Sequence, residues 1–286
     1  MKNKDKEFYF TTFEKFHKYK VKPKAKQSLR QLIVSEEEAE NIDEPPTFKD
    51  IGLEALHEEG HLDHLAGVIR SGKEATVYLG KYKNTYIAVK IYADRSSCLF
   101  QKKNIYCDGR TMKNKRYRKA LLKNTRIGKG INQALWIEEE YKQLSYFYLN
   151  EIPVPRPISQ SERVIVMELI GDNGMPAPRL SDLNLSNQEA KMAFNQSVYN
   201  LGMILKAGRV HGDYSTYNIL WWDQKAIVID FPQTVSIENN HNFIFLLNRD
   251  ISSLCKSFSQ VGYTKGEEIV KREVLEISQL DLNDFQ

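Results

Sequence analysis

Two carboxylates and one amide follow one another in an order that suits phosphate chemistry. Asp213 is followed five residues later by Asn218, and Asp230 ends the apolar run 227–229. Mg²⁺ prefers oxygen ligands, which the Asn218 amide and the Asp230 carboxylate would supply. Asp213 would then stand beside the group that receives a phosphoryl group. Because Asp and Asn are also common turn residues, local hydrogen bonding is the competing explanation.

The spacing of these three residues is more informative than their types. An Asp, four intervening residues, an Asn and a later Asp after an apolar strand form the pattern of the catalytic loop and metal-binding Asp of protein kinases. The two segments that carry it are 211–220 and 227–231. The pattern predicts Asp213 as the catalytic carboxylate and Asn218 and Asp230 as metal ligands.

A short polar turn precedes two predicted strands upstream. It contains Ser71, Gly72 and Lys73. Backbone N–H groups in such a turn, together with the Ser71 hydroxyl, are able to hold phosphate oxygens. The turn lacks a G-x-G-x-x-G pattern, and an ordinary hairpin turn explains the same residues.

Lys90 follows an apolar strand pattern and needs a carboxylate partner if it is to hold phosphates. The predicted helix 131–149 offers Glu138, Glu139 and Glu140. At about 100° per residue, Glu140 lies about 70° from the centre of the apolar stripe, Glu138 about 90° and Glu139 on the opposite face. We therefore predict that Glu140 pairs with Lys90. The alternative is that all three acids face solvent.

The elements that must position these residues follow from hydrophobic periodicity. Alternation predicts strands within 67–80 and 85–92, and an apolar run predicts a buried strand at 164–170. A capping box that begins at Ser186 predicts a helix that stops at Gly208. Short strands are expected on both sides of the catalytic loop.

The chain divides into three parts. Residues 1–46 are polar and predict a tail or linker that adds little to the core. Residues 47–170 hold N-terminal helices and the strands around Lys90, with a basic insertion at 95–130. Residues 171–286 follow a connector rich in Gly and Pro and carry the catalytic loop.

Together these segments resemble the RIO kinases, and the similarity covers residues 47–258. The motifs occur in the family's order: Ser71–Tyr78 resembles its glycine-poor phosphate loop, Trp136–Leu144 its W-x-E-x-E helix, and 151–155, 166–171, 175–178, 211–213 and 229–233 are similar to further family segments. Ordinary protein kinases have Asp-Phe-Gly where this chain has Asp-Phe-Pro at 230–232, and their A-P-E activation segment is absent here. The chain combines features of two RIO subgroups. Residues 230–233 resemble the subgroup that carries a winged helix, and residues 175–178 resemble the second subgroup.

The resemblance implies an α+β, truncated two-lobed protein-kinase-like fold with a small β-rich N-lobe and a mainly helical C-lobe. It implies ATP as a ligand with Mg²⁺, or Mn²⁺ in its place, and puts Glu140 at the lysine-pairing position. Nucleotide contacts are then expected at Ser71, Gly72, Lys73, Val77 and Lys90, with adenine at a hinge that contains Met167, Glu168 and Ile170. The family residue that matches Asp230 is discussed as a transient phosphate acceptor, so an ATPase cycle is an alternative to protein phosphorylation.

Composition places the chain among ordinary globular proteins. It has 286 residues, of which 41% are apolar and 27% charged. No window approaches the roughly 20 apolar residues of a membrane span, and the first residues lack the apolar region of a secretion signal. The three cysteines show no C-x-x-C spacing. These features predict a soluble cytoplasmic protein without a disulfide framework, a zinc ribbon or a membrane partner.

Positive charge is concentrated in the segment 102–129. It carries eleven Lys and Arg residues and one acid, a net +10, which leaves −6 for the rest of the chain. With Tyr106 and Tyr117 this composition suits contact with RNA or a ribosomal particle. We predict a segment that is mobile in the free protein and orders when phosphates neutralise it. A solvated loop explains the composition equally well.

The sequence His57-Glu-Glu-Gly-His61 fits the H-E-x-x-H pattern of metalloproteases, with His64 as a possible third ligand. Such a site needs both histidines on one continuous helix, and Gly60 interrupts it. A solvated helix end is the preferred explanation.

The sequence therefore predicts an ATP- and Mg²⁺-dependent phosphotransferase or ATPase, a serine/threonine protein kinase of RIO type with an unidentified protein acceptor. Two alternatives stay open. One is a small-molecule phosphotransferase of aminoglycoside- or choline-kinase type, whose H-G-D-x-x-x-x-N-I-L loop resembles 211–220. The other is an assembly factor that binds RNA or ribosomal particles and turns over ATP slowly.

Overall fold

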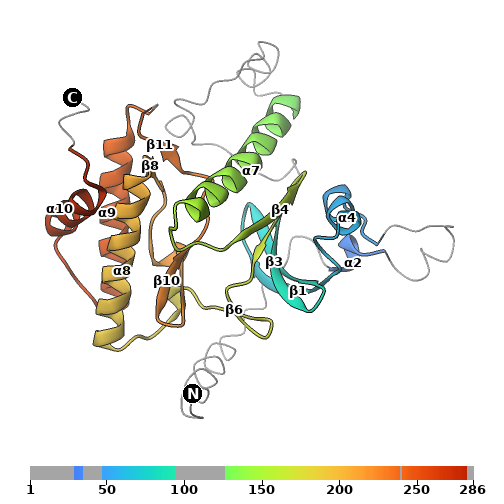
Figure 1. Cartoon of the computed structure of the whole chain (residues 1–286), viewed down its shortest axis with the longest axis horizontal. Helices are drawn as coiled ribbons and strands as arrows, with labels where there is room; N and C mark the ends of the chain where they lie inside the picture. The colour runs from blue at the N-terminus through green and yellow to red at the C-terminus, as the bar shows by residue number, and fades with distance from the viewer. Residues whose placement is uncertain (1–28, 35–46, 94–125, 239, 282–286) are drawn as a thin grey trace.

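A computed structural model describes residues 29–34, 47–93, 126–238 and 240–281 of the chain. Figure 1 shows a sheet with two short helices beside it, a group of three helices on the opposite side of the molecule, and the long helix α7 (Arg126–Leu149) between them. The expected α+β architecture of one β-rich and one mainly helical lobe is confirmed.

The β-rich lobe is built on one five-stranded antiparallel sheet in the order β1-β2-β3-β5-β4. The strands are β1 (His64–Ser71), β2 (Ala75–Tyr82), β3 (Thr85–Tyr92), β4 (Pro157–Ser161) and β5 (Val164–Glu168). The predicted β2–β3 turn is present, and Lys83 adopts a positive φ of 52° there. Residues of β2 and β3 pair without a register shift, which fixes the side chains that share each face.

Two short helices cover one face of this sheet, α2 (Leu29–Leu32) and α4 (Ile51–Glu58). Asp50 caps α4 by accepting hydrogen bonds from the backbone N–H groups of Gly52 and Leu53. We expected residues 1–46 to add little to the core, but Leu32 is buried against the sheet. Leu29 and Ile33 of the same short segment pack against this core beside Leu32.

Helix α7 covers the other face and joins the two lobes. It begins at Arg126, five residues before the expected start, so the end of the basic segment belongs to this helix. Ile137 packs against Tyr92 and Ile165 of the sheet, whereas Leu144 and Phe147 belong to the core of the helical lobe. The helix therefore fixes the position of one lobe relative to the other.

Three helices form most of the second lobe: α8 (Asn187–Lys206), α9 (Phe243–Gln260) and α10 (Glu267–Ser278). The predicted capping box at Ser186 is present, and Gly208, with a φ of 73°, follows the end of α8. The short elements are β6 (Gly171–Asp172), β7 (Met175–Pro176), η1 (Leu180–Asp182), β8 (Arg209–Val210), η2 (Thr216–Asn218), β9 (Ile219–Trp222), β10 (Lys225–Val228) and β11 (Val235–Ser236). β6 pairs with β7, β8 with β11, and β9 with β10. None of the helices in the described residues is long and apolar enough to cross a membrane.

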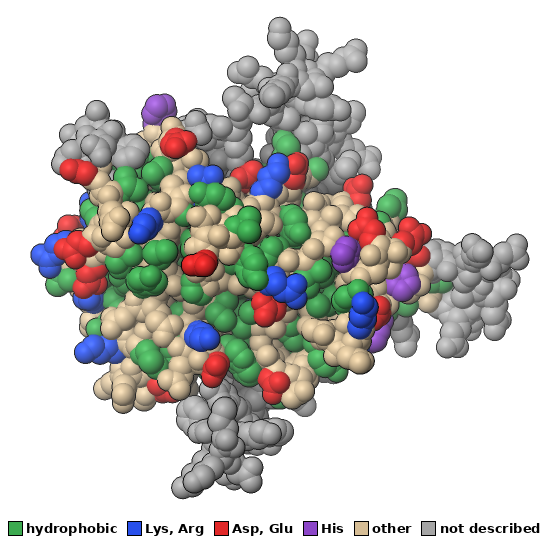
Figure 2. All heavy atoms as spheres, viewed as in Figure 1, with side chains coloured by type: hydrophobic (Ala, Val, Ile, Leu, Met, Phe, Trp, Pro, Cys, Tyr) green, Lys and Arg blue, Asp and Glu red, His purple; other side chains and the backbone are tan. Residues whose placement is uncertain are grey.

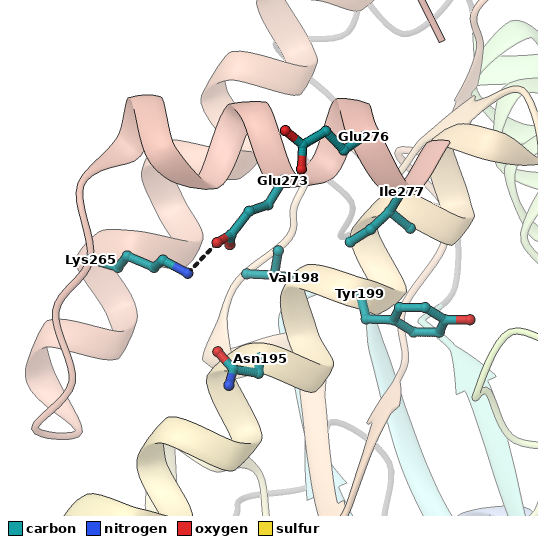
Figure 3. Close-up of a pocket in the computed structure, with 7 residues that line it drawn as sticks. All are labelled: Asn195, Val198, Tyr199, Lys265, Glu273, Glu276 and Ile277. Atoms are coloured by element: carbon teal, nitrogen blue, oxygen red, sulfur yellow. Dashed lines mark hydrogen bonds and ion pairs between the residues drawn. The ribbon is translucent and has the colours of Figure 1, made fainter. Parts of the chain in front are cut away.

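Helices α8 and α10 approach closely enough that a glycine is required between them. Figure 3 shows Val198 and Tyr199 of α8 beside Ile277 of α10, around a surface hollow that an ion pair borders. A Cβ atom at Gly202 would lie 2.6 Å from the Cβ atom of Ile277. Gly202 therefore sets the distance between the two helices.

Gly202→Ala should destabilise the fold although alanine is the better helix former. Overpacking costs about 1–3 kcal/mol, which exceeds the gain of about 0.5–1 kcal/mol from replacing a helical glycine. Urea denaturation followed by circular dichroism measures the difference. Gly67→Ala on β1 is the control, because a Cβ atom there would meet no atom within 4 Å. Equal stability of the two variants would contradict the close helix contact.

Candidate active site

Lys90 lies on the face of the sheet that points towards α7 and the helical lobe. Cross-strand pairing aligns it with Val77 on β2 and Ile165 on β5, and Arg70 on β1 continues the same row. Side chains that face one another across strands point to the same side of a sheet. Strand pairing therefore places Lys90, Val77 and Arg70 in one row on the face of the sheet that points towards the helical lobe, and we call the space between this face and the catalytic loop the cleft.

The Lys90 ammonium group binds two carboxylates that come from different elements. It donates to Oε1 of Glu140 on α7 and, at 2.7 Å, to Oδ1 of Asp230, which follows β10. The exposed fraction of the Lys90 side chain is 12% and that of Glu140 is 4%. The contact joins three segments that are far apart in the chain.

Among the three neighbouring acids of α7, Glu140 is the one that faces inward. Its second oxygen accepts a hydrogen bond from the hydroxyl group of Tyr92. Glu138 forms an exposed ion pair with Lys142, and Glu139 accepts from the Gln143 amide. Helical periodicity predicted this orientation correctly, because the buried residues Trp136, Ile137 and Leu144 fix the rotation of the helix.

The three charges shift one another's pKa values. Burial raises the pKa of Glu140 to about 7, against the opposing effect of Lys90. Burial alone would lower the pKa of Lys90, but Asp230 and Glu140 raise it, so the ammonium group stays charged. Burial alone would raise the pKa of Asp230, but Lys90 holds it below the usual value. Asp230 therefore stays ionised, as a metal ligand must be.

Asp230 adopts a backbone conformation that is rare for a residue with a side chain. Its φ is 73°, in the left-handed region. Such strain costs on the order of 1–3 kcal/mol and is retained where the surroundings fix it, most often at functional sites. The conformation leaves 39% of the side chain exposed while Oδ1 binds Lys90. Asp230 therefore presents a carboxylate to the cleft.

Asp213 and Asn218 face each other across the catalytic loop. The Asn218 amide nitrogen donates to the Asp213 carbonyl group at 2.9 Å and to its carboxylate at 3.1 Å. Asn218 is 6% exposed, whereas Asp213 is exposed. Because the amide nitrogen points towards Asp213, the amide oxygen points away from it and is placed to bind a cation.

His211 ties the catalytic loop to the strand that precedes Asp230. Its Nδ1 atom accepts from the Asp213 backbone N–H at 3.3 Å, and its Nε2 atom lies 3.3 Å from the Ile229 carbonyl oxygen. Burial lowers the pKa of His211, so the ring is neutral with its proton on Nε2. The histidine therefore sets the spacing between Asp213 and Asp230.

Two residues of α9 hold the same loop, and the sequence reasoning did not select them. The buried carboxylate of Asp250 accepts from the backbone N–H groups of Gly212 at 2.8 Å and Tyr214 at 3.1 Å. Arg249 donates to the Gly212 carbonyl oxygen. A signal for Asp250 was present, because it lies on the apolar stripe of α9 with Leu246 and Leu254, where an acid needs a buried partner.

The predicted phosphate loop is the hairpin turn between β1 and β2. The Gly72 N–H donates to the Ala75 carbonyl oxygen at 2.8 Å, and the Ser71 hydroxyl lies 3.4 Å from that of Thr76. Gly72 and Lys73 are exposed. The turn thus forms an ordinary hairpin that closes the pair β1–β2, and Val77 of β2 pairs in turn with Lys90 of β3. The two sequence interpretations, a loop that holds phosphate and an ordinary hairpin turn, are therefore compatible.

The predicted hinge leaves the sheet at the end of β5. Met167 and Glu168 still pair with Ala88 and Ile87 of β3, and the Ile170 carbonyl oxygen accepts from Ala177 at 2.8 Å. Glu168 is exposed and its carboxylate accepts from the backbone of Arg156. The segment links the two lobes, and its contacts fix it to both β3 and the connector that follows.

Other candidates lie away from this cleft or outside the described residues. His57 contacts the Leu62 carbonyl oxygen at 2.8 Å, and the described part of the chain contains no group of three or more acids, histidines or cysteines that could hold a metal. The hollow in Figure 3 is lined by residues of α8 and α10 and of the turn before α10, and by none of the candidate site residues. Most of the basic segment 102–129 lies outside the described residues.

The fold and the site together define a protein-kinase-like fold with a reduced helical lobe. A crystal structure of Rio2 kinase from Chaetomium thermophilum, described as an ADP/Mg²⁺-phosphoaspartate complex, is similar in fold with a TM-score of 0.55. The two share 21% identity over 82% of this chain and 71% of that one. At this identity the likeness concerns the fold alone.

The chain belongs to the RIO family. The RIO domain model matches residues 76–271. The chain is 32% identical over 208 residues to Serine/threonine-protein kinase RIO1 of Caenorhabditis elegans, which is 72% of this chain and 39% of that relative. It is 30% identical to the RIO-type serine/threonine-protein kinase Rio1 of Haloferax volcanii, over 77% of this chain and 72% of that one. The resemblance on which the sequence analysis rested is confirmed.

Asp250 should make the stability of the protein depend on pH. Burial raises the pKa of Asp250 to about 7, so its stabilising effect is fully present below its unfolded pKa of about 4 and is lost as pH rises through about 7. Asp250→Asn removes one acceptor, which should cost about 1–3 kcal/mol, and removes this titration. Denaturation free energies at pH 5 and pH 8 should therefore differ less in Asp250→Asn than in the wild type. The exposed Asp172→Asn variant should keep the wild-type difference, and a wild-type difference in Asp250→Asn as well would show that Asp250 is not the group responsible.

Proposed function

We propose that the protein is an ATP- and Mg²⁺-dependent phosphotransferase of RIO type that acts on serine or threonine hydroxyl groups. The contact of Lys90 with both Glu140 and Asp230 carries the proposal, because it holds a phosphate-binding cation beside a metal-binding acid. The names of the curated relatives agree with this activity. The chain spans about two fifths of the C. elegans relative, so that protein's own substrates and partners are not transferred to it.

Each residue has one task in this proposal. Mg²⁺ would be held by Asp230 and Asn218 and would neutralise phosphate charge. Lys90 binds phosphate oxygens, and Glu140 fixes the direction of its side chain. Asp213 is the exposed carboxylate of the loop, and it accepts the proton of the attacking hydroxyl group. The turn at 71–73 and Val77 cover the nucleotide, and the hinge at Met167, Glu168 and Ile170 binds adenine.

An ATPase reaction is the second candidate, and the exposure of Asp230 favours it. An Asp230 oxygen attacks the terminal phosphorus of ATP, the bond to the bridging oxygen breaks, and ADP leaves. Water then hydrolyses the acyl phosphate to free phosphate and restores the carboxylate. The C. thermophilum Rio2 structure is described as containing a phosphoaspartate of that protein. Here the reaction requires the exposed edge of Asp230 to turn towards the nucleotide.

The other two interpretations are not favoured by the family match. A small-molecule kinase needs an acceptor pocket after Asp230, and α9 and α10 are the helices described in that part of the chain.

On the face drawn in Figure 2, acidic and basic side chains of the described residues are interspersed. Contact with RNA or a ribosomal particle is proposed for the basic segment 102–129, which carries eleven Lys and Arg residues and one acid. A cytoplasmic location stays part of the proposal.

Asp213→Asn and Asp230→Ala should both abolish phosphoryl transfer but differ in nucleotide binding. Loss of general base catalysis lowers the rate by about 10²–10⁴-fold, and Asp213→Asn should leave the affinity for ATP unchanged. Asp230→Ala should also weaken the Mg²⁺ dependence of ATP binding. Transfer from γ-labelled ATP and isothermal titration measure the two effects. Asp223→Asn in the exposed β9–β10 turn is the control, and full activity in either site variant would contradict the assignment.

Glu140→Gln should lower turnover on the order of tenfold or more while Glu139→Gln does not. The neutral amide no longer attracts the Lys90 ammonium group, so phosphates are held less precisely, and a tenfold loss of rate corresponds to about 1.4 kcal/mol. Both changes remove one negative charge from neighbouring positions of α7, which makes them a matched pair. Steady-state turnover with a melting curve for each variant is the measurement. Impaired Glu139→Gln beside unchanged Glu140→Gln would show that the wrong acid was assigned.

A further inference from the structure

Arg179 has its backbone fixed beside the catalytic loop. It forms an isolated β-bridge with Leu220, two residues after Asn218, and its carbonyl oxygen accepts from the Asp182 N–H at 3.0 Å. The residue stands between the connector that follows the hinge and the short helix η1. These contacts fix the Arg179 backbone in the helical lobe, next to the strand that follows Asn218, whereas Lys90 belongs to the sheet.

The guanidinium group of Arg179 lies within electrostatic range of Arg70, Asp182 and Asp230. Burial and repulsion from Arg70 lower its pKa, and Asp230 and Asp182 act in the opposite direction. It is therefore close enough to all three groups to be influenced by them. Within the described part of the chain, the Arg179 side chain makes no hydrogen bond or ion pair, although it is partly buried. Arginine has five N–H donors in a planar fork, and those of Arg179 are free of protein partners among the described residues and therefore available to a ligand.

The other cations of the cleft already have partners. Lys90 binds two carboxylates, and Arg70 binds Asp182 at 3.1 Å across the mouth of the cleft. The exposed fraction of the Arg70 side chain is 44%. Of these three cations, Arg179 is the one whose donors remain available to an anion that enters between the lobes.

We propose that Arg179 binds the phosphate tail of the nucleotide from the helical lobe, opposite Lys90. The inference deepens the proposed function and rests on it. A guanidinium group forms two parallel hydrogen bonds to phosphate oxygens, which an ammonium group cannot do. Glu140 and Asp230 already neutralise the charge of Lys90. Arg179 supplies a further positive charge for the phosphates. Sequence reasoning gave no sign of it, because the residue belongs to no catalytic pattern.

The test compares nucleotide affinities in Arg179→Gln, Arg179→Lys and wild-type protein. Isothermal titration measures binding of ATP with Mg²⁺, and ligand-observed NMR measures binding of adenosine, which has no phosphate. Arg179→Gln should weaken ATP binding about tenfold or more and leave adenosine binding unchanged. Arg179→Lys keeps the charge without the fork and should lie between. Arg272→Gln, which removes the same charge from an exposed position on α10, should match the wild type.

Two results would overturn the role of Arg179. Equal weakening of ATP and adenosine binding in Arg179→Gln would show that the residue only supports the fold of the cleft, and a lower melting temperature would accompany it. Unchanged ATP affinity in a variant that still binds adenosine would show that its donors do not reach the phosphates. If the wild type itself fails to bind ATP, the proposed function is wrong, and the inference about Arg179 is wrong as well. The behaviour of the wild type thus separates the two failures.

Discussion

The buried contact of Lys90 with two carboxylates is the interaction on which the arrangement of the cleft depends. Removing one partner of a buried ion pair costs about 3–5 kcal/mol, because the remaining charge is left uncompensated. The three partners come from β3, from α7 and from the chain after β10. The sheet, the connecting helix and the helical lobe must therefore adopt their positions together. This requirement explains why α7 contributes Ile137 to the contact with the sheet and Leu144 and Phe147 to the core of the helical lobe.

By contrast, the ion pair at the mouth of the cleft contributes little to the joining of the lobes. Arg70 and Asp182 are both partly exposed, and exposed pairs contribute about 0–1 kcal/mol. The lobes are held by the buried side chains of α7 and by the Lys90 contact instead. Separating β1 from η1 at this pair therefore costs little.

The Asp213 carboxylate is exposed because other groups satisfy the hydrogen bonds of the backbone around it. Asp250 accepts two loop N–H groups, Arg249 binds a loop carbonyl group, and His211 links the loop to the strand before Asp230. The loop is thus held by α9 and, through His211, by Ile229 directly after β10. The exposed carboxylate of Asp213 accepts a hydrogen bond from the Asn218 amide and is not needed to hold the loop in place.

The sequence by itself determined the elements and most of the candidate residues, because local patterns record local constraints. Alternation located the strands around Lys90, the capping box located the start of α8, and helical periodicity selected Glu140 from three neighbouring acids. Motif spacing indicated Asp213, Asn218 and Asp230 before any contact was known, although their roles remain proposals. Only the tertiary structure decided which distant groups meet. The approach of Asp230 to Lys90, the support that Asp250 gives to the loop, and the place of Arg179 in the cleft follow from the packing of two lobes, and sequence spacing carries no information about distances between segments that far apart.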